Sequence, residues 1–198
     1  MKLIKAKDII IIILVLSLVF LYYGKQRNHQ ENSNIERQQK LLEQRVDNLQ
    51  ILSKLQHYGE GKSIRDIYLY TLNKDSVLFS RLIGNENKLV FYFSEFGCSS
   101  CYLPFLQKLS KIDKKLKNST IIIAGFNSAR DFKIFKNEHK IEVPVYRIKT
   151  NLGLYPEYND YALAFLISER MIIDNLMIID YSNRNYIDDY LAILESKI

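Results

Sequence analysis

The chain has 198 residues, of which 47% are hydrophobic and 25% charged, and its formal net charge is +6 at pH 7. This composition is that of a globular protein and excludes a disordered, collagen-like or low-complexity chain. Two cysteines are too few for a disulfide-rich scaffold or for all four ligands of a zinc finger. The basic excess is greatest in residues 108–140, with no nucleic-acid-reading motif beside it, so we expect no nucleic-acid partner.

The first predicted element is an apolar segment, residues 9–23, which contains no charged residue. As a helix it would rise about 22 Å, short of the roughly 30 Å hydrocarbon core of a bilayer, and flanking Lys7 and Lys25 could reach the interface to make up the difference. A cleaved signal peptide has a similar apolar stretch, but the small residues of a cleavage site do not follow here. The sequence therefore predicts an uncleaved membrane anchor over residues 1–27, with a weak preference for a cytoplasmic N-terminus.

Residues 28–60 are predicted to form a helical stalk. Ile35, Leu42 and Leu49 recur every seven residues in a polar stretch without Pro or Gly, which is the spacing of a short coiled coil. Two interpretations stay open: the stalk joins two copies of the chain in a homodimer, or it is a helical spacer.

The third predicted region, residues 62–198, is an α/β domain. Its apolar run at residues 88–94 is typical of a strand buried on both faces. The order of the elements predicts a mixed sheet flanked by helices. We expect strands at 66–72, 76–79, 88–94, 121–126, 162–168 and 171–179, an extended stretch at 143–146, and helices at 103–116, 128–139 and 186–196.

The two cysteines, Cys98 and Cys101, lie where the predicted strand passes into a helix. Free backbone N–H groups at a helix N-terminus stabilise a thiolate and raise its nucleophilic fraction. A spacing of three brings the second sulfur back to the same end of the helix, so the pair could cycle between dithiol and disulfide. We expect Cys98 to attack a partner and Cys101 to resolve the mixed disulfide.

Two other interpretations of the cysteine pair compete with a redox role. A metal site would need two more ligands, and the three histidines are not paired at metal-binding spacing. A structural disulfide would close a loop too small to stabilise the fold by much.

The strand at 88–94, the segment Glu95-Phe96-Gly97-Cys98-Ser99-Ser100-Cys101 and the hairpin of residues 162–179 resemble the thioredoxin-fold redoxins. Over about residues 62–198 the chain looks most like the membrane-tethered, extracytoplasmic thiol–disulfide oxidoreductases. The resemblance implies a thioredoxin-like sheet with Cys98 as nucleophile and no metal or organic cofactor. It also implies a single-pass protein of the bacterial inner membrane with its domain in the periplasm. Its partners would be protein thiols and disulfides and a membrane electron-transfer protein.

Three positions depart from the pattern of that family. The family has a cis-proline before the strand that matches 162–168, whereas Ala162 stands there, and we expect a trans bond because a non-proline cis bond costs about 3 kcal/mol. Gly97 replaces the aromatic residue before the first cysteine, with Phe96 one position earlier. Pro104 lies closer to the second cysteine than the usual kink proline and could bend or restart the helix.

The remaining predicted site residues surround the cysteines. Glu95 is the only acid near them in sequence, and we predict that it carries a proton to or from Cys101; a solvated loop carboxylate is the alternative. We expect the substrate groove to be lined by Phe96, Gly97, Ser99, Ser100, Tyr161 and Ala162. For Tyr161, a position in the core or at its rim is the alternative.

The leading functional hypothesis is therefore a membrane-anchored thiol–disulfide oxidoreductase, with the direction of electron flow open. A non-enzymatic, thioredoxin-like binding or redox-sensing module is the alternative, since the proline opposite the cysteines is missing. A peroxidase of the peroxiredoxin type is disfavoured, because that family has Thr or Ser three residues before its nucleophile, where this chain has Glu95.

Overall fold

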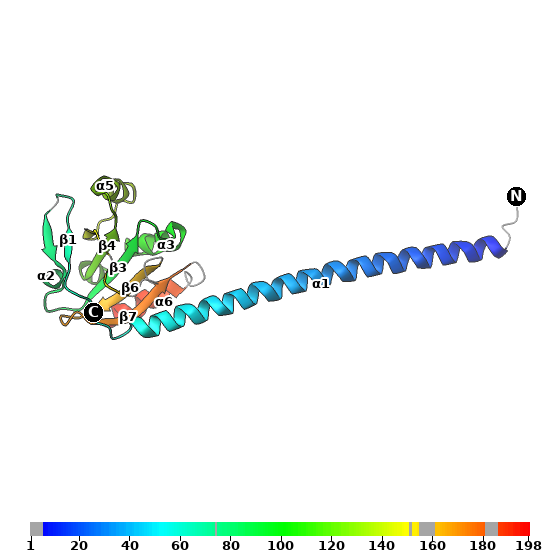
Figure 1. Ribbon diagram of the computed structural model, residues 1–198, viewed down its shortest axis with the longest axis horizontal. Coiled ribbons are helices and arrows are strands. Elements are labelled where there is room, and N and C mark those ends of the chain that lie inside the picture. Colours follow the sequence, from blue (N-terminus) through cyan, green and yellow to red (C-terminus); the bar gives the residue numbers. More distant parts are fainter. Residues whose placement is uncertain (1–5, 74, 151, 155–160, 181–185) are drawn as a thin grey trace. The chain divides into compact units, whose positions relative to one another are not determined.

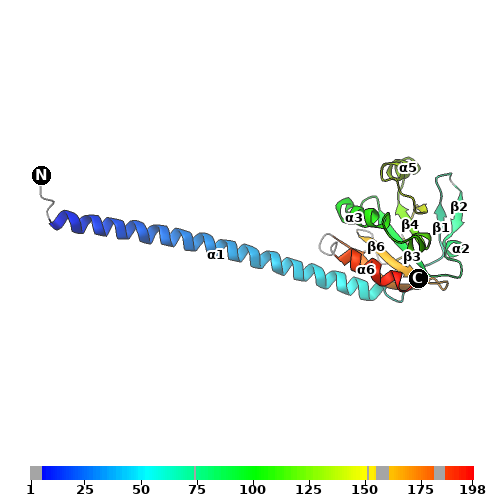
Figure 2. The same ribbon diagram turned by 180° about the vertical axis from the view of Figure 1, so that it is seen from behind.

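The computed structural model describes residues 6–73, 75–150, 152–154, 161–180 and 186–198. Figure 1 shows the order of its helices and strands, and Figure 2 shows the same ribbon from behind. The chain divides into two compact units, residues 1–49 and residues 50–198.

The first unit is formed by the greater part of one helix, α1 (Ala6–Gly59). This helix runs through the predicted anchor and the predicted stalk without a break at Gly24. In the part of the chain that the structure describes, we find no helix with an apolar stretch long enough to cross a membrane. The anchor over residues 1–27 stays a prediction from the sequence.

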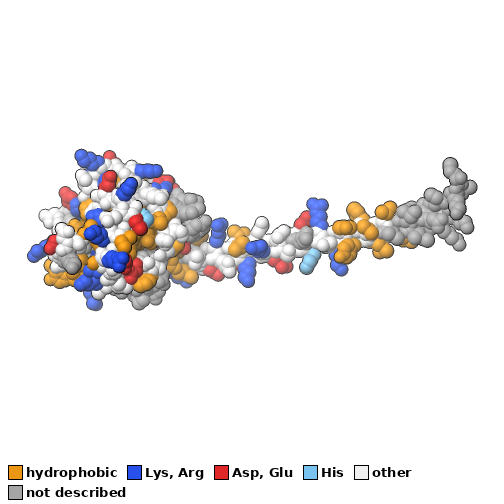
Figure 3. Space-filling model, turned by 90° about the horizontal axis from the view of Figure 1, so that it is seen from above, with side chains coloured by type: hydrophobic (Ala, Val, Ile, Leu, Met, Phe, Trp, Pro, Cys, Tyr) orange, Lys and Arg blue, Asp and Glu red, His pale blue; other side chains and the backbone are white. Residues whose placement is uncertain are grey.

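In the stalk region of α1, the apolar residues of the heptad stripe are exposed. Charged side chains of both signs project from this part of the helix (Figure 3). Ile35, Leu42 and Leu49 are between 51% and 59% exposed. Both interpretations of the stalk, a homodimer contact and a spacer, therefore stay predictions.

The second unit is built on a mixed sheet that has seven strands in the described residues, in the order β2-β1-β5-β4-β3-β6-β7. The central strands β3, β4 and β5 are parallel, and β6, β7 and the β1–β2 hairpin pair antiparallel at the two sides. The predicted mixed sheet is confirmed. The strands are β1 (Tyr68–Tyr70), β2 (Ser76–Leu78), β3 (Lys88–Ser94), β4 (Thr120–Gly125), β5 (Val145–Ile148), β6 (Ala162–Ile167) and β7 (Ile173–Ile179).

Helices cover both faces of this sheet (Figure 1). The crossovers β3–α3–β4 and β4–α5–β5 step across the sheet in the same direction, and right-handed crossovers then place both helices on one face. That face buries Phe91 and Phe93, while α2 and the last turns of α1 cover the face with Val90 and Tyr92. The remaining helices are α2 (Phe79–Ile83), α3 (Ser99–Leu109), α4 (Lys114–Asn118), α5 (Ala129–Glu138) and α6 (Ile187–Glu195).

Two predicted elements differ from the structure. The helix predicted at 103–116 is two helices: α3 runs through Pro104 and ends at Leu109, and α4 starts anew after Asp113, whose carboxylate accepts from the Lys115 backbone N–H at 2.8 Å. Phe79, predicted as the end of a strand, is instead the first residue of α2. Its side chain is fully buried, in the core on the α2 face of the sheet. Helix capping and tertiary burial decide both cases.

The second unit includes the end of α1 and begins at Gln50, earlier than the predicted boundary at residue 62. Leu52 is only 6% exposed and belongs to the core on the α2 face. Glu60, just after the helix, accepts hydrogen bonds from the backbone N–H groups of Asn175 at 2.5 Å and Leu176 at 2.8 Å. The last turns of the helix are therefore part of the folded domain.

Candidate redox site

The two cysteines form a disulfide at the N-terminus of α3, with a Cα–Cα distance of 5.2 Å. Cys98 is the N-cap residue, and its carbonyl oxygen accepts from the backbone N–H of Cys101 at 2.9 Å and of Tyr102 at 3.3 Å. The predicted position, between a buried strand and a helix, is confirmed. In the reduced state, the free N–H groups of this first turn would stabilise a thiolate on Cys98.

The two sulfur-bearing residues differ in exposure. Cys98 is exposed, whereas Cys101 is 7% exposed and belongs to the buried residues of α3. The hydroxyl of Ser100 lies 3.2 Å from the Cys98 sulfur, within reach to donate a hydrogen bond to a thiolate there. Ser99, the first residue of α3, is exposed.

A tight turn leads from β3 to the cysteines. The Gly97 backbone N–H donates to the Ser94 carbonyl at 3.1 Å, and the Phe96 backbone N–H donates to the Ser94 hydroxyl at 3.1 Å. The turn leaves the Phe96 side chain 81% exposed. A large apolar side chain in water this close to the disulfide is suited to contact a partner protein.

Aromatic stacking holds α3 against the sheet below the disulfide. Tyr102 stacks on Phe93 with ring centroids 4.5 Å apart, and Phe105 stacks on Phe91 at the same distance. Burial raises the pKa of the Tyr102 phenol, which keeps this ring neutral. The helix that carries the cysteines is therefore packed on the aromatic side chains of β3.

Tyr161 and Ala162 lie at the edge of the sheet where β3 ends. Leu163 of the antiparallel strand β6 pairs with Tyr92, so β6 starts beside the end of β3. Every peptide bond in the described residues is trans, which confirms the trans bond expected before Ala162. Ala162 is buried on the α3 face, whereas Tyr161 is half-buried and packs on the opposite core. Their role in a groove stays a prediction.

Glu95 makes contacts that the sequence did not indicate. Its two carboxylate oxygens accept hydrogen bonds from Asn127, one from the backbone N–H at 3.1 Å and one from the side-chain amide at 2.7 Å. Its backbone N–H donates to the Gly125 carbonyl at 2.9 Å. The predicted proton transfer to Cys101 stays a prediction.

Arg147 is a second residue near this edge that sequence reasoning missed. It is 8% exposed, and its guanidinium donates to the carbonyl oxygens of Asn127 at 2.9 Å and Phe126 at 3.4 Å. The same guanidinium lies 5.6 Å from the ring centroid of Tyr70. A charged residue inside the short apolar strand Val145–Ile148 was the available signal.

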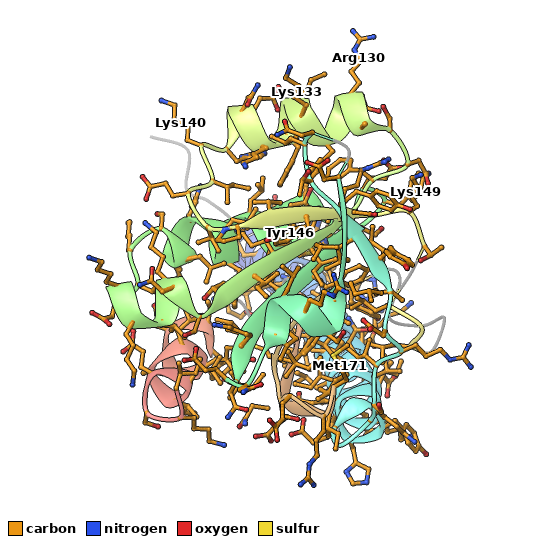
Figure 4. All side chains as sticks on the ribbon, turned by 90° about the vertical axis from the view of Figure 1, so that its left-hand side faces the viewer. Arg130, Lys133, Lys140, Tyr146, Lys149 and Met171 are labelled. Carbon is orange, nitrogen blue, oxygen red and sulfur yellow. A yellow bond between two sulfur atoms is a disulfide. The ribbon has the colours of Figure 1, made fainter. Side chains whose placement is uncertain are left out.

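The basic residues of α5 have no part in this arrangement. Arg130 and Lys133 extend from α5 away from the sheet (Figure 4). On the face that Figure 3 shows, basic and acidic side chains are mixed.

No group of three or more His, Cys, Asp or Glu residues that could hold a metal ion occurs among the described residues.

No protein-family model matches the sequence, and no curated protein matches it significantly. Among solved structures, the chain is similar to the peroxidoxin BcpB from Mycobacterium tuberculosis, at a TM-score of 0.50 and 14% identity over 70% of this chain and 97% of the other. A thiol:disulfide interchange protein from a Bacteroides species has a TM-score of 0.49 and 17% identity, over 67% of this chain and 90% of the other. The thioredoxin domain of a thiol-disulfide oxidoreductase from Bacteroides vulgatus has a TM-score of 0.46 and 16% identity, over 67% of this chain and 97% of the other.

The likeness to the peroxidoxin, together with the mixed sheet flanked by helices, confirms the predicted thioredoxin-like fold. At 14% identity the likeness shows the fold alone.

Proposed function

We propose that the chain is a thiol–disulfide oxidoreductase that exchanges disulfides with protein thiols. The observation that carries this proposal is the pairing of an exposed Cys98 with a buried Cys101 at the N-terminus of α3. An exposed sulfur can meet a partner, and a buried one beside it can complete the exchange.

The exchange would take two steps. The Cys98 thiolate attacks a partner disulfide, one partner sulfur bonds to Cys98, and the other leaves as a thiolate. The Cys101 thiolate then attacks Cys98, forms the intramolecular disulfide and releases the first partner sulfur as a thiolate. The partner gains two electrons and the cysteine pair loses two. The reverse sequence oxidises a partner dithiol, and no other cofactor is needed.

The proposed substrate groove would be formed by residues around the disulfide. Phe96 and Gly97 precede Cys98, Ser99 and Ser100 lie between the cysteines, Ala162 is the first residue of β6, and Tyr161 comes just before it. The exposed Phe96 ring is the apolar contact for a partner, and Ala162 leaves the backbone of β6 free of the usual proline ring.

The membrane part of the proposal rests on the sequence. Residues 1–27 would anchor the chain once in a bacterial inner membrane, with the second unit in the periplasm. A membrane electron-transfer protein would then restore the cysteine pair after each exchange. Pairing of two stalks in a homodimer is compatible with this arrangement.

Trapping of mixed disulfides tests the proposal. In cells that express the Cys101→Ser variant, partner proteins should accumulate on Cys98 as bands that disappear on reduction, because the resolving thiol is gone. The Cys98→Ser variant is the matched control and should trap none. If Cys98→Ser reduced a model disulfide at the parent rate, the assignment of the attacking sulfur would be wrong.

The alternative function, a binding or redox-sensing module, is favoured by Ala162 at the place of the family's proline. Redox titration separates the two functions. A reversible two-electron couple with turnover of a disulfide substrate indicates the enzyme, and a slow couple without turnover indicates the module.

A further inference from the structure

We propose that Asn127 is a positioning residue, which holds the carboxylate of Glu95 and thereby sets the reactivity of Cys98. The inference rests on the proposed function, because it takes Cys98 as the attacking sulfur. It adds a regulation of that sulfur by a residue of the next loop, which follows β4.

The segment before Cys98 is fixed at its start by three hydrogen bonds. Two join the Glu95 carboxylate to Asn127, at 2.7 Å and 3.1 Å, and the third joins the Glu95 backbone N–H to Gly125 at 2.9 Å. Only Phe96 and Gly97 separate Glu95 from Cys98. A shift of Glu95 is therefore passed on to the N-cap residue and its sulfur.

Asn127 is itself held in place from two sides. Its carbonyl oxygen accepts from the buried guanidinium of Arg147 at 2.9 Å. The next residue, Ser128, caps α5 by accepting from the backbone N–H groups of Arg130 at 3.2 Å and Asp131 at 3.4 Å. Because its own loop is tied to β5 and to α5, Asn127 offers its two donors in a fixed direction.

The charge of Glu95 gives this contact a chemical consequence. A carboxylate near a thiolate disfavours the charged sulfur and raises the pKa of the thiol. Two donors from Asn127 hold the carboxylate at the β4 side of the loop and satisfy its oxygens. Loss of these donors would free a negative charge three residues from Cys98 and loosen the turn, and both effects slow the attack by Cys98.

The test exchanges the amide of Asn127 and the carboxylate of Glu95 by substitution. In a Cys101→Ser background, the rate of Cys98 alkylation by iodoacetamide is measured against pH in the full chain. Asn127→Asp sets a second carboxylate against Glu95 and should raise the pKa of the Cys98 thiol, slowing alkylation at pH 7 about three- to tenfold. The double variant Glu95→Gln with Asn127→Asp restores one amide and one carboxylate, and should return the rate to within about twofold of the parent.

The control is Asn137→Asp, which adds the same charge at an exposed position of α5 and should leave the alkylation profile unchanged. The proposal is overturned if Asn127→Asp alkylates like the parent, or if Glu95→Gln fails to restore the double variant. Should Asn127→Asp not fold, Asn127→Ala removes the side-chain donor without adding charge and should slow alkylation in the same direction. A parent that exchanges no disulfide would defeat the proposed function, while the alkylation rates would still decide the role of Asn127.

Discussion

Cys98 and Cys101 share one disulfide but lie in different surroundings. Cys98 is an exposed residue whose sulfur has the Ser100 hydroxyl at 3.2 Å, whereas Cys101 is one of the buried residues of α3. Under the proposed function, a partner would meet Cys98 first. The buried Cys101 would then react only after a mixed disulfide brings its target sulfur within reach.

Phe96 should decide how well the site binds a protein partner. Replacement by Ser removes an apolar ring that is 81% exposed in the free chain, and partial burial of such a ring on binding contributes about 1–2 kcal/mol. We therefore expect Phe96→Ser to raise KM for a protein disulfide roughly tenfold, with a smaller effect on kcat. Steady-state kinetics with a protein disulfide provides the measurement.

The matched control for this prediction is Ile193→Ser, since Ile193 is also an exposed apolar side chain, on α6. It should leave KM unchanged. An equal rise of KM in both variants would mean that Phe96 makes no specific contact with the partner.

A site residue could be predicted from the sequence where its role depends on residues close to it along the chain. The position of Cys98 and Cys101 follows from a buried strand, a helix start and a spacing of three. Asn127 and Arg147 could not be found in this way, because Asn127 meets Glu95 across 32 residues and Arg147 meets Asn127 across 20. Such contacts depend on the pairing of β3, β4 and β5.

At the scale of elements, strands buried on both faces were the most predictable. The apolar run at residues 88–94 is β3 with the predicted bounds, since a continuous apolar sequence suits a central strand. Short helices were missed: α2 and α4 have five residues each, fewer than the periodicity of an amphipathic helix needs. Their positions depend on one buried aromatic residue and on one capping aspartate.

The junction between α1 and the sheet makes a separate prediction at this scale. Asn175 has a left-handed φ of 53° in β7, beside an irregularity in the β6–β7 pairing, and the Glu60 carboxylate binds two adjacent N–H groups there. Glu60→Gln replaces one acceptor by a donor that faces a donor. We expect it to lower the free energy of unfolding by about 1 kcal/mol.

This loss is measured by denaturant unfolding of the full chain, in which far-UV circular dichroism records the unfolding transition of the second unit. Glu36→Gln, in the first unit, is the control and should change the free energy of unfolding by less than about 0.5 kcal/mol. A Glu60→Gln variant as stable as the parent would show that the N–H groups at the bulge are equally well bound by water.

At the scale of the whole molecule, the two units differ in how they are stabilised. The second unit buries two cores, one on each face of its sheet. In residues 14–49 every side chain that the structure describes is exposed, and an isolated helix gains little stability without packing. A bilayer around residues 1–27 and a second copy of the stalk, both predictions from the sequence, would each cover apolar side chains of α1.

The predicted anchor leads to the last test. If residues 1–27 hold the chain in a membrane, the full chain should stay in the membrane fraction after a carbonate wash, and a chain lacking these residues should be soluble. The double substitution Leu16→Lys with Leu18→Lys keeps the length and should also release the chain, because each lysine at the centre of a membrane helix costs about 2.5–3.5 kcal/mol. Both altered chains should keep the fold of the second unit, whose cores include no residue before Leu52. Release of the unaltered chain by the wash would contradict the anchor and leave a second copy of the stalk as the partner of the apolar stripe.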